Sequence, residues 1–311
     1  MSLTNLTGTI VPLVTPFGAD GALNPEGMTQ LIDYVIDQGA DALMPTALTG
    51  EGPLLTSEEM RNVWEVVFTK VQGRLPVIPA IISITTENAI KLARSAESFG
   101  ADALMVAPII PELYAARSHD DVYGFYSDVA SVTSLPIILF NYPTLTGVDF
   151  LPALVEKLVQ IDNVRYIKES TGDSRRVQAL QRQIGERITV ICGAPNFALE
   201  SLALGCRLWL TGIMNIVPRS ARQLMQAVIS KGDLVLARSI YYQQILPFGD
   251  VMARNNNPTG TIKAGVLARG VDVGGPRRPG NMVTPEDLEL IRKLVEEVVR
   301  EEEKVAQELE K

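Results

Sequence analysis

A short unit recurs along this 311-residue chain and constrains its fold more than any other feature. "QGADALMPTA" begins at Gln38, "FGADALMVAP" begins at Phe99, and a looser copy, "LGCRLWLTGI", begins at Leu204. Each copy follows an amphipathic stretch and has glycine where a helix would end, before a short apolar run. The repeated unit is therefore a helix followed by a strand.

Short apolar runs alternate with longer runs of helical period over most of the chain. They predict strands over residues 9–13, 42–45, 77–80, 103–107, 137–140, 165–168, 189–192 and 208–212. Helices are predicted over residues 25–38, 58–71, 87–99, 120–131, 151–158, 175–184, 197–203 and 218–231. Eight strands with intervening helices predict the α/β class and a (β/α)₈ TIM barrel over residues 1–231.

Residues 232–311 show helical stretches broken by "NNNPTG" and "VGGPRRPG", which predict a helical C-terminal extension. An open doubly wound sheet is the alternative fold. No G-x-G-x-x-G follows the first predicted strand, which disfavours a dinucleotide-binding version of that alternative.

Charge and composition exclude several classes of partner. The net charge of −8 argues against a nucleic acid or an anionic membrane, because phosphate binding needs concentrated lysine and arginine. There is no apolar run of membrane-spanning length and no secretion signal at the N-terminus, so we expect a cytoplasmic protein. Cys192 and Cys206 lie in apolar stretches and His119 is the single histidine, so we expect no disulfide and no metal site.

The run "VRYIKES" over residues 164–170 ends a predicted strand with a lysine. Lys168 shares one face with Val164 and Tyr166, which are apolar or aromatic. A lysine that extends from the strand end into solvent is one interpretation. In a barrel, however, the active site lies at the C-terminal ends of the strands. There, burial would lower the pKa of Lys168 and make its amine a nucleophile, suited to Schiff-base formation with a 2-oxo acid.

The loop "TGEGP" follows the second predicted strand. Its glycines can expose N–H groups near Thr49 and Gly50 that bind a carboxylate, although Thr-Gly is also ordinary turn chemistry. Glu51 is a candidate general base, but a carboxylate at the start of a helix more often satisfies unpaired amides, so we favour a structural role.

Six segments, in this order along essentially the whole chain, resemble the dihydrodipicolinate synthase / N-acetylneuraminate lyase family of pyruvate-dependent class I aldolases: "GTIVPLVTPF", "TGEGPLLTSEE", "PIILFNYPTLTGVDF", "YIKESTGD", "GIMNIVP" and "TIKAGVLARGVDVGGPRRP". The resemblance implies a (β/α)₈ barrel with a helical C-terminal part and a homo-oligomer, a tetramer or a dimer. It also implies that the substrate binds covalently to a lysine, with no metal and no dissociable cofactor.

The resemblance also assigns roles to residues. It implies that Lys168 is the Schiff-base lysine and that Thr49 and Gly50 bind the carboxylate of the 2-oxo acid. Gly193 matches a glycine whose backbone lines the same pocket, and Asn215 lies in a segment similar to the eighth strand of the family.

Four departures from the family pattern make this a divergent member rather than a typical dihydrodipicolinate synthase. Phe140 stands where the family has a tyrosine that shuttles protons, and Leu48 replaces a hydroxyl residue before Thr49. Ile109-Ile110 replaces an aromatic pair, and Leu145 replaces an arginine of the synthases. A positioned proton-transfer group contributes about 10²- to 10⁴-fold to a rate, so the loss at position 140 matters.

Three replacements for the missing tyrosine stay open: Tyr142, Tyr114, or groups of the substrate together with water. The favoured function is a Schiff-base lyase that acts on pyruvate or a related 2-oxo acid and cleaves or condenses a C–C bond, with an aldehyde as a further possible partner, or eliminates water. The alternatives are a catalytically weakened paralogue that binds 2-oxo acids, and a deoxy sugar acid dehydratase.

Overall fold

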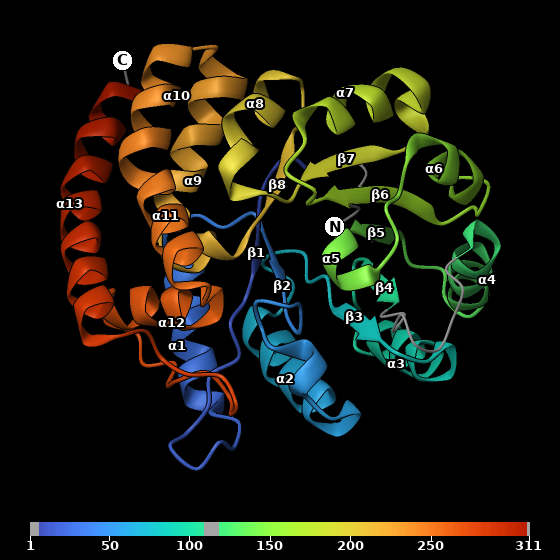
Figure 1. Cartoon of the computed structure of the whole chain (residues 1–311). Helices are drawn as coiled ribbons and strands as arrows, with labels where there is room; N and C mark the ends of the chain where they lie inside the picture. Colours follow the sequence, from blue (N-terminus) through green and yellow to red (C-terminus); the bar gives the residue numbers. More distant parts are fainter. Residues whose placement is uncertain (1–5, 109–117, 310–311) are drawn as a thin grey trace.

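The computed structural model describes residues 6–108 and 118–309 and contains a barrel of eight parallel strands (Figure 1). The strands are β1 (Gly8–Pro12), β2 (Ala42–Met44), β3 (Ala80–Ser83), β4 (Leu104–Pro108), β5 (Ile137–Asn141), β6 (Val164–Glu169), β7 (Thr189–Cys192) and β8 (Leu208–Leu210). Their order is β2-β1-β8-β7-β6-β5-β4-β3. Leu43 in β2 exchanges backbone hydrogen bonds with Pro76 and Ile78, just before β3, and so brings the two ends of the sheet together. The predicted (β/α)₈ barrel is confirmed.

Helices follow the strands and cover the outside of the barrel (Figure 1). They are α1 (Pro25–Asp37), α2 (Ser57–Val71), α3 (Thr86–Ser98), α4 (His119–Ala130), α6 (Pro152–Leu158), α7 (Ser174–Gln183), α8 (Ala198–Ala203) and α9 (Pro218–Met225). Side-chain caps begin two of these helices: the Asn24 side chain caps α1, and Thr56 with Glu59 forms a capping box at α2. A short helix, α5 (Pro143–Thr146), follows β5 and lies outside the predicted elements.

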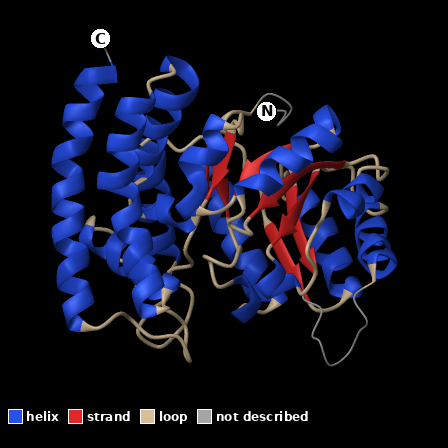
Figure 2. Cartoon of the chain, turned by 45° about the horizontal axis from the view of Figure 1, so that its top comes forward, coloured by secondary structure: helices blue, strands red, loops and turns tan. Residues whose placement is uncertain are grey.

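The C-terminal part is helical, as predicted, and gathers on one side of the barrel (Figure 2). Two π-helical segments, η6 (Gln226–Lys231) and η7 (Tyr241–Ile245), lie among α10 (Leu234–Ile240), α11 (Leu246–Asn255), α12 (Pro258–Ala268) and α13 (Pro285–Leu309). Buried Glu302 in α13 accepts hydrogen bonds from Ser220 and Arg269 and so ties α13 to the barrel. The division of the chain at residue 232 stays a prediction.

One strand lies later than predicted. β3 begins at Ala80, whereas the apolar run predicts residues 77–80. Pro79 has no N–H group, so regular pairing with β4 starts only at the next residue. No helix in the described ranges is long and apolar enough to cross a membrane.

The inside of the barrel is filled by a separate apolar layer of side chains. Its buried members include Ile10, Met44, Ile82, Met105, Ile138, Phe140, Tyr166, Ile191 and Leu210. Lys168 follows Tyr166 on the same face of β6, so its amine enters this layer from the C-terminal end.

Candidate active site

Lys168 lies near the end of β6 with its side chain 9% exposed. It is in register with Phe140 in β5 and Ile191 in β7, and its Nζ lies 4.3 Å from the centre of the Phe140 ring. This burial lowers the pKa of the Lys168 amine from 10.5 to about 7. The amine is therefore retained in the barrel rather than extended into solvent, and a large fraction of it is uncharged near pH 7.

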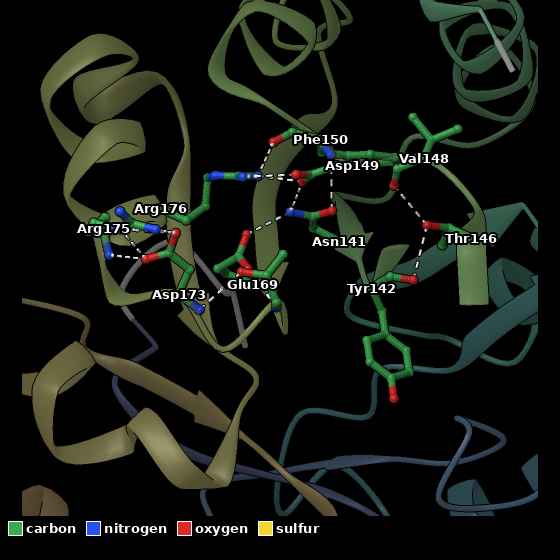
Figure 3. A network of polar contacts seen from close by, with 11 residues as sticks. Asn141, Tyr142, Thr146, Val148, Asp149, Phe150, Glu169, Asp173, Arg175 and Arg176 are labelled. Carbon is green, nitrogen blue, oxygen red and sulfur yellow. Dashed lines mark hydrogen bonds and ion pairs between the residues drawn. The ribbon is translucent and has the colours of Figure 1, made fainter. Parts of the chain in front are cut away.

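The opposite face of β6 ends in Glu169, whose polar contacts hold the end of the strand in place (Figure 3). Asn141 at the end of β5 donates to Glu169 over 2.7 Å and to Asp149 over 3.2 Å. Its Oδ1 atom accepts from the Phe150 amide over 3.0 Å, and Arg176 pairs with Asp149. Burial raises the pKa of Glu169. The network joins the ends of β5 and β6, and thereby fixes the strands that carry Phe140 and Lys168.

The loop after β2 is held in an unusual conformation. Thr46 has a φ of 60°, and its hydroxyl accepts from the Trp64 indole over 2.9 Å. Thr15 donates to the Gly50 carbonyl over 2.6 Å. Within the described part of the chain, the amides of Thr49 and Gly50 have no hydrogen-bond acceptor. A carboxylate could accept from these amides, and their role in binding the 2-oxo acid stays a prediction.

Glu51 anchors this loop to the C-terminal region. It is buried, forms a 2.9 Å ion pair with Lys263, and accepts from the Arg277 amide over 2.8 Å. Lys263 also donates to the carbonyls of Thr15 and Gly275, each over 2.8 Å. With its carboxylate engaged in this way, Glu51 has the geometry of a structural residue.

Two residues that the sequence assigns to the site have their polar groups engaged within the protein. The Gly193 amide donates to the Glu169 carbonyl over 2.7 Å, and a Cβ atom at Gly193 would lie 2.9 Å from Cγ of Lys168. Because glycine has no Cβ atom, the backbone at Gly193 can lie this close to the Lys168 side chain. Asn215 donates to the carbonyls of Pro12 and Gly212 and accepts from the Val14 amide, so it joins β1 to the segment after β8.

Phe140 and Tyr142 form an aromatic path from the inside of the barrel toward its mouth. Phe140 is 1% exposed, whereas Tyr142, two residues later, is 37% exposed. The two rings stack with their centres 5.9 Å apart and their planes at 22°. Figure 3 shows that Tyr142 points away from the network around Asn141. Leu48, in the loop after β2, packs against the inner apolar layer where the family pattern has a hydroxyl residue.

Ser170 is a residue that the sequence reasoning missed. Its amide donates to the Asn141 carbonyl over 3.0 Å, so the pairing of β5 with β6 continues to this residue. Ser170 therefore shares a face with Lys168, one step nearer the mouth. Its hydroxyl oxygen is shielded from solvent and has no hydrogen-bond partner among the described residues. The spacing of two residues from Lys168 is the signal that could have identified it.

The comparisons with known proteins agree with this geometry. The sequence model of the "Dihydrodipicolinate synthetase family" matches residues 5–298. The chain belongs to this family. A 4-hydroxy-tetrahydrodipicolinate synthase of Pelobacter propionicus is 34% identical over 260 residues, which cover 84% of this chain and 88% of that protein. The synthase of Pseudomonas aeruginosa is 32% identical over 288 residues, which cover 92% of this chain and 96% of that protein.

Solved structures give the same result. A dihydrodipicolinate synthase from Aquifex aeolicus has a TM-score of 0.86 at 29% identity, and the match covers 94% of this chain and 97% of that chain. The chloride-inhibited synthase of Acinetobacter baumannii, complexed with pyruvate, has a TM-score of 0.87 at 26% identity, with 94% and 99% covered.

As a member of the dihydrodipicolinate synthetase family, the chain is a class I aldolase-type lyase that acts on pyruvate. The family forms a covalent Schiff base between pyruvate and a lysine and uses no cofactor. In the described ranges, no three His, Cys, Asp or Glu residues are placed to bind a metal ion. Ile109, Ile110 and Tyr114 lie outside the described residues.

Proposed function

We propose that Lys168 is the Schiff-base lysine and that the enzyme makes or breaks a C–C bond next to the bound 2-oxo acid. The observation that supports this most is the buried amine of Lys168, whose pKa of about 7 leaves it nucleophilic. The carboxylate of pyruvate would accept from the amides of Thr49 and Gly50, which places the C2 carbonyl carbon toward the amine.

In the condensation direction, the Lys168 amine adds to C2 of pyruvate, and loss of water gives the imine. Loss of a proton from the methyl carbon then gives an enamine. The enamine carbon attacks an aldehyde, and the aldehyde oxygen takes up a proton as the C–C bond forms. Addition of water to the imine releases a 4-hydroxy-2-oxo acid and the free amine. The cleavage direction reverses each step.

We further propose that hydroxyl groups next to Phe140 transfer the protons. Phe140 pairs with Lys168 in register, so Tyr142 and Ser170 occupy the next step toward the mouth. The Ser170 hydroxyl has no partner among the described residues, so rotation about its χ1 angle toward the substrate would break no hydrogen bond. Tyr142 is the alternative donor, because its exposed ring stacks on Phe140.

A catalytically weakened, 2-oxo-acid-binding paralogue is the second candidate function. Phe140 and Leu48 stand where the family pattern has hydroxyl residues, and both lie at the inner apolar layer. Neither side chain can transfer a proton, which favours this second candidate. This protein would form the imine but would not remove the methyl proton.

Borohydride trapping with pyruvate tests the proposal. We expect a single reduced adduct on Lys168 by intact mass and peptide mapping, and no adduct in Lys168→Ala. Lys91→Ala is the matched control, because Lys91 is exposed in α3 and pairs only locally with Glu87. Exchange of the pyruvate methyl protons in deuterium oxide separates the two candidates. A trapped adduct without exchange supports the binding paralogue, and no adduct would contradict both.

We also propose a homo-oligomer, a tetramer or a dimer, in the cytoplasm, with a 2-oxo acid and an aldehyde as small-molecule partners. The support for the oligomer is the family resemblance. Light scattering after gel filtration would test the oligomeric state.

A further inference from the structure

The loop that carries the Thr49 and Gly50 amides lies between two residues in the left-handed backbone region. Thr46 has a φ of 60° and Glu51 has a φ of 56°, although both carry a side chain. This conformation is uncommon for residues other than glycine, and it persists only where neighbouring groups hold it in place. The geometry of the two amides therefore depends on the contacts at both ends of the loop.

Different parts of the molecule hold these two ends. The Thr46 hydroxyl accepts from the Trp64 indole and donates to the Ala80 carbonyl over 2.8 Å, so the barrel itself fixes the first end. At the second end, the Glu51 carboxylate lies 2.9 Å from Nζ of Lys263, which belongs to α12. A helix of the C-terminal part thus helps to fix a loop of the candidate active site.

Lys263 contacts this loop by two routes. Besides its ion pair with Glu51, its ammonium group donates to the Thr15 carbonyl over 2.8 Å. The Thr15 hydroxyl in turn donates to the Gly50 carbonyl over 2.6 Å. The remaining contact of the ammonium group is the Gly275 carbonyl, also at 2.8 Å. An ammonium group has three donors, so these contacts engage all of them.

Lys263 itself is placed where it cannot contact a substrate. Its side chain is fully buried, and the Glu51 carboxylate balances its charge. Lys168, in contrast, lies near the end of β6 beside the inner apolar layer. Any contribution of Lys263 to substrate binding is therefore one of position, exerted through Glu51 and Thr15.

We propose that Lys263 is a positioning residue for the 2-oxo acid. Through Glu51 and Thr15, it holds the loop so that its free amides can bind the carboxylate of the substrate. The inference rests on the proposed function, because that carboxylate must belong to the molecule that forms the imine with Lys168. Loss of the anchor should weaken the binding of 2-oxo acids without changing the reactivity of the Lys168 amine, which lies on another strand.

The test measures trapping with cyanoborohydride over a range of concentrations of pyruvate and of methyl pyruvate, in which an ester replaces the carboxylate. Each series gives a half-saturating concentration and a maximal rate of formation of the Lys168 adduct. Both compounds react through the same C2 carbonyl group. The ratio of their half-saturating concentrations therefore reports recognition of the carboxylate.

Two variants remove the anchor to different extents. Glu51→Gln keeps the length of the side chain but removes its charge, and should raise the half-saturating concentration of pyruvate by about three- to tenfold. Lys263→Met combined with Glu51→Gln also removes the contact with Thr15, and should raise it by about ten- to a hundredfold. For methyl pyruvate, and for the maximal rates, we expect changes of less than about twofold.

The double variant separates positioning from stability. Glu51→Gln should restore part of the stability that Lys263→Met loses, because it removes the unpaired buried carboxylate. A merely structural role of Lys263 would let pyruvate binding recover together with stability. A positioning role predicts that the half-saturating concentration of pyruvate stays raised in the double variant.

Glu302→Gln is the matched control. Glu302 forms a buried 3.0 Å ion pair with Arg269, which directly follows α12, so this change removes a similar pair among the same C-terminal helices. It should lower the free energy of unfolding, measured in urea, and leave both half-saturating concentrations within about twofold of the wild type.

Trapping in the wild type keeps the two proposals distinguishable. An adduct on Lys168, together with a loss confined to pyruvate in the anchor variants, supports both. An adduct with unchanged pyruvate binding in those variants, with equal losses for the two compounds, or with the same loss in Glu302→Gln, overturns the positioning role and leaves the Schiff-base lysine in place. Absence of an adduct in the wild type overturns both.

Discussion

The reactivity of Lys168 should follow its burial, and pH is the variable that reveals this. An ordinary lysine with a pKa near 10.4 has about one free amine in 2,500 at pH 7. Burial lowers the pKa of Lys168 to about 7, so about half of its amine is free at that pH. The rate of imine formation at neutral pH should therefore exceed that of an exposed lysine by about a thousandfold from this cause alone.

The assay measures the rate at which pyruvate and cyanoborohydride form the Lys168 adduct between pH 5.5 and 9.5. We expect a sigmoidal rise with its midpoint at a pH of about 7, the pKa of the buried amine, and a plateau above pH 8. Phe140→Leu should move the midpoint lower, because the ring 4.3 Å from Nζ stabilises the ammonium form. A rate that still rises tenfold per pH unit at pH 9 would refute the reasoning.

The same burial should appear in the stability of the protein. Below pH 7 the folded and unfolded chains both bind the proton, so the amine adds no pH dependence. Between pH 7 and 10.5 the unfolded chain keeps the proton and the folded chain has lost it, so the free energy of unfolding rises with pH. Because half of the folded-state amine is still protonated at pH 7, the rise from pH 7 to 9 is about 2 kcal/mol, and it approaches about 1.4 kcal/mol per pH unit only above pH 8.

Lys168→Met isolates this contribution, because it keeps the apolar stem and removes the titrating group. Urea unfolding of both proteins at pH 6.5, 7.5 and 9 should show that the free energy of unfolding of Lys168→Met exceeds that of the wild type most at pH 6.5. Burial raises the pKa of Cys192 to about 11, so the comparison stops at pH 9, before that thiol titrates. A difference that does not change with pH would contradict the burial of a titrating amine.

Three further predictions test other parts of the site. Gly193→Ala should lower the free energy of unfolding by about 1–3 kcal/mol, because the new Cβ would lie 2.1 Å from Oγ of Ser170. Gly124→Ala, in helix α4 with no atom within 4 Å of the new Cβ, should raise it by about 0.5–1 kcal/mol; equal effects in urea unfolding would count against close packing at Gly193. Lys263→Met should cost about 3–5 kcal/mol by leaving Glu51 buried and unpaired, and addition of Glu51→Gln should recover part of this loss; a double variant no more stable than the single one would argue against the pair. Ser170→Ala should slow the exchange of pyruvate methyl protons by about tenfold while Ser170→Thr retains it, measured by NMR in deuterium oxide; unchanged exchange in Ser170→Ala would remove Ser170 from the proposed proton transfer.

Much of the fold follows from local patterns that the sequence makes visible. The apolar run over residues 189–192 coincides with β7, because a short apolar segment between polar loops is best buried as a strand of the barrel. The α2 start at Ser57 follows from the capping box. β3 begins later than predicted because Pro79 interrupts a uniform apolar run. Hydrophobicity alone cannot show which half of such a run pairs regularly with the next strand.

The site was only partly predictable, since its geometry depends on contacts between distant segments. Alternation along β6 places Lys168 inward with Tyr166, and the structure agrees, whereas Val164 lies in the outer core because the pairing with β5 shifts register next to it. Asn215, in contrast, has its amide group engaged by β1, about 200 residues earlier in the chain, so no local pattern could reveal that its polar atoms are engaged. The spacing of Ser170 from Lys168 is visible in the sequence, but that its hydroxyl has no hydrogen-bond partner among the described residues is visible only in the structure.

The two faces of β6 explain how one strand can be both well anchored and reactive. The outward face carries Glu169, whose carboxylate accepts from Asn141 and from the Thr171 amide over 2.7 Å. These polar contacts hold the strand without placing an acceptor beside Lys168 on the inward face. A carboxylate next to the amine would stabilise the ammonium form and raise its pKa. Because the inner apolar layer excludes water from the amine instead, the same arrangement that fixes the lysine also lowers its pKa and leaves much of the amine uncharged near pH 7.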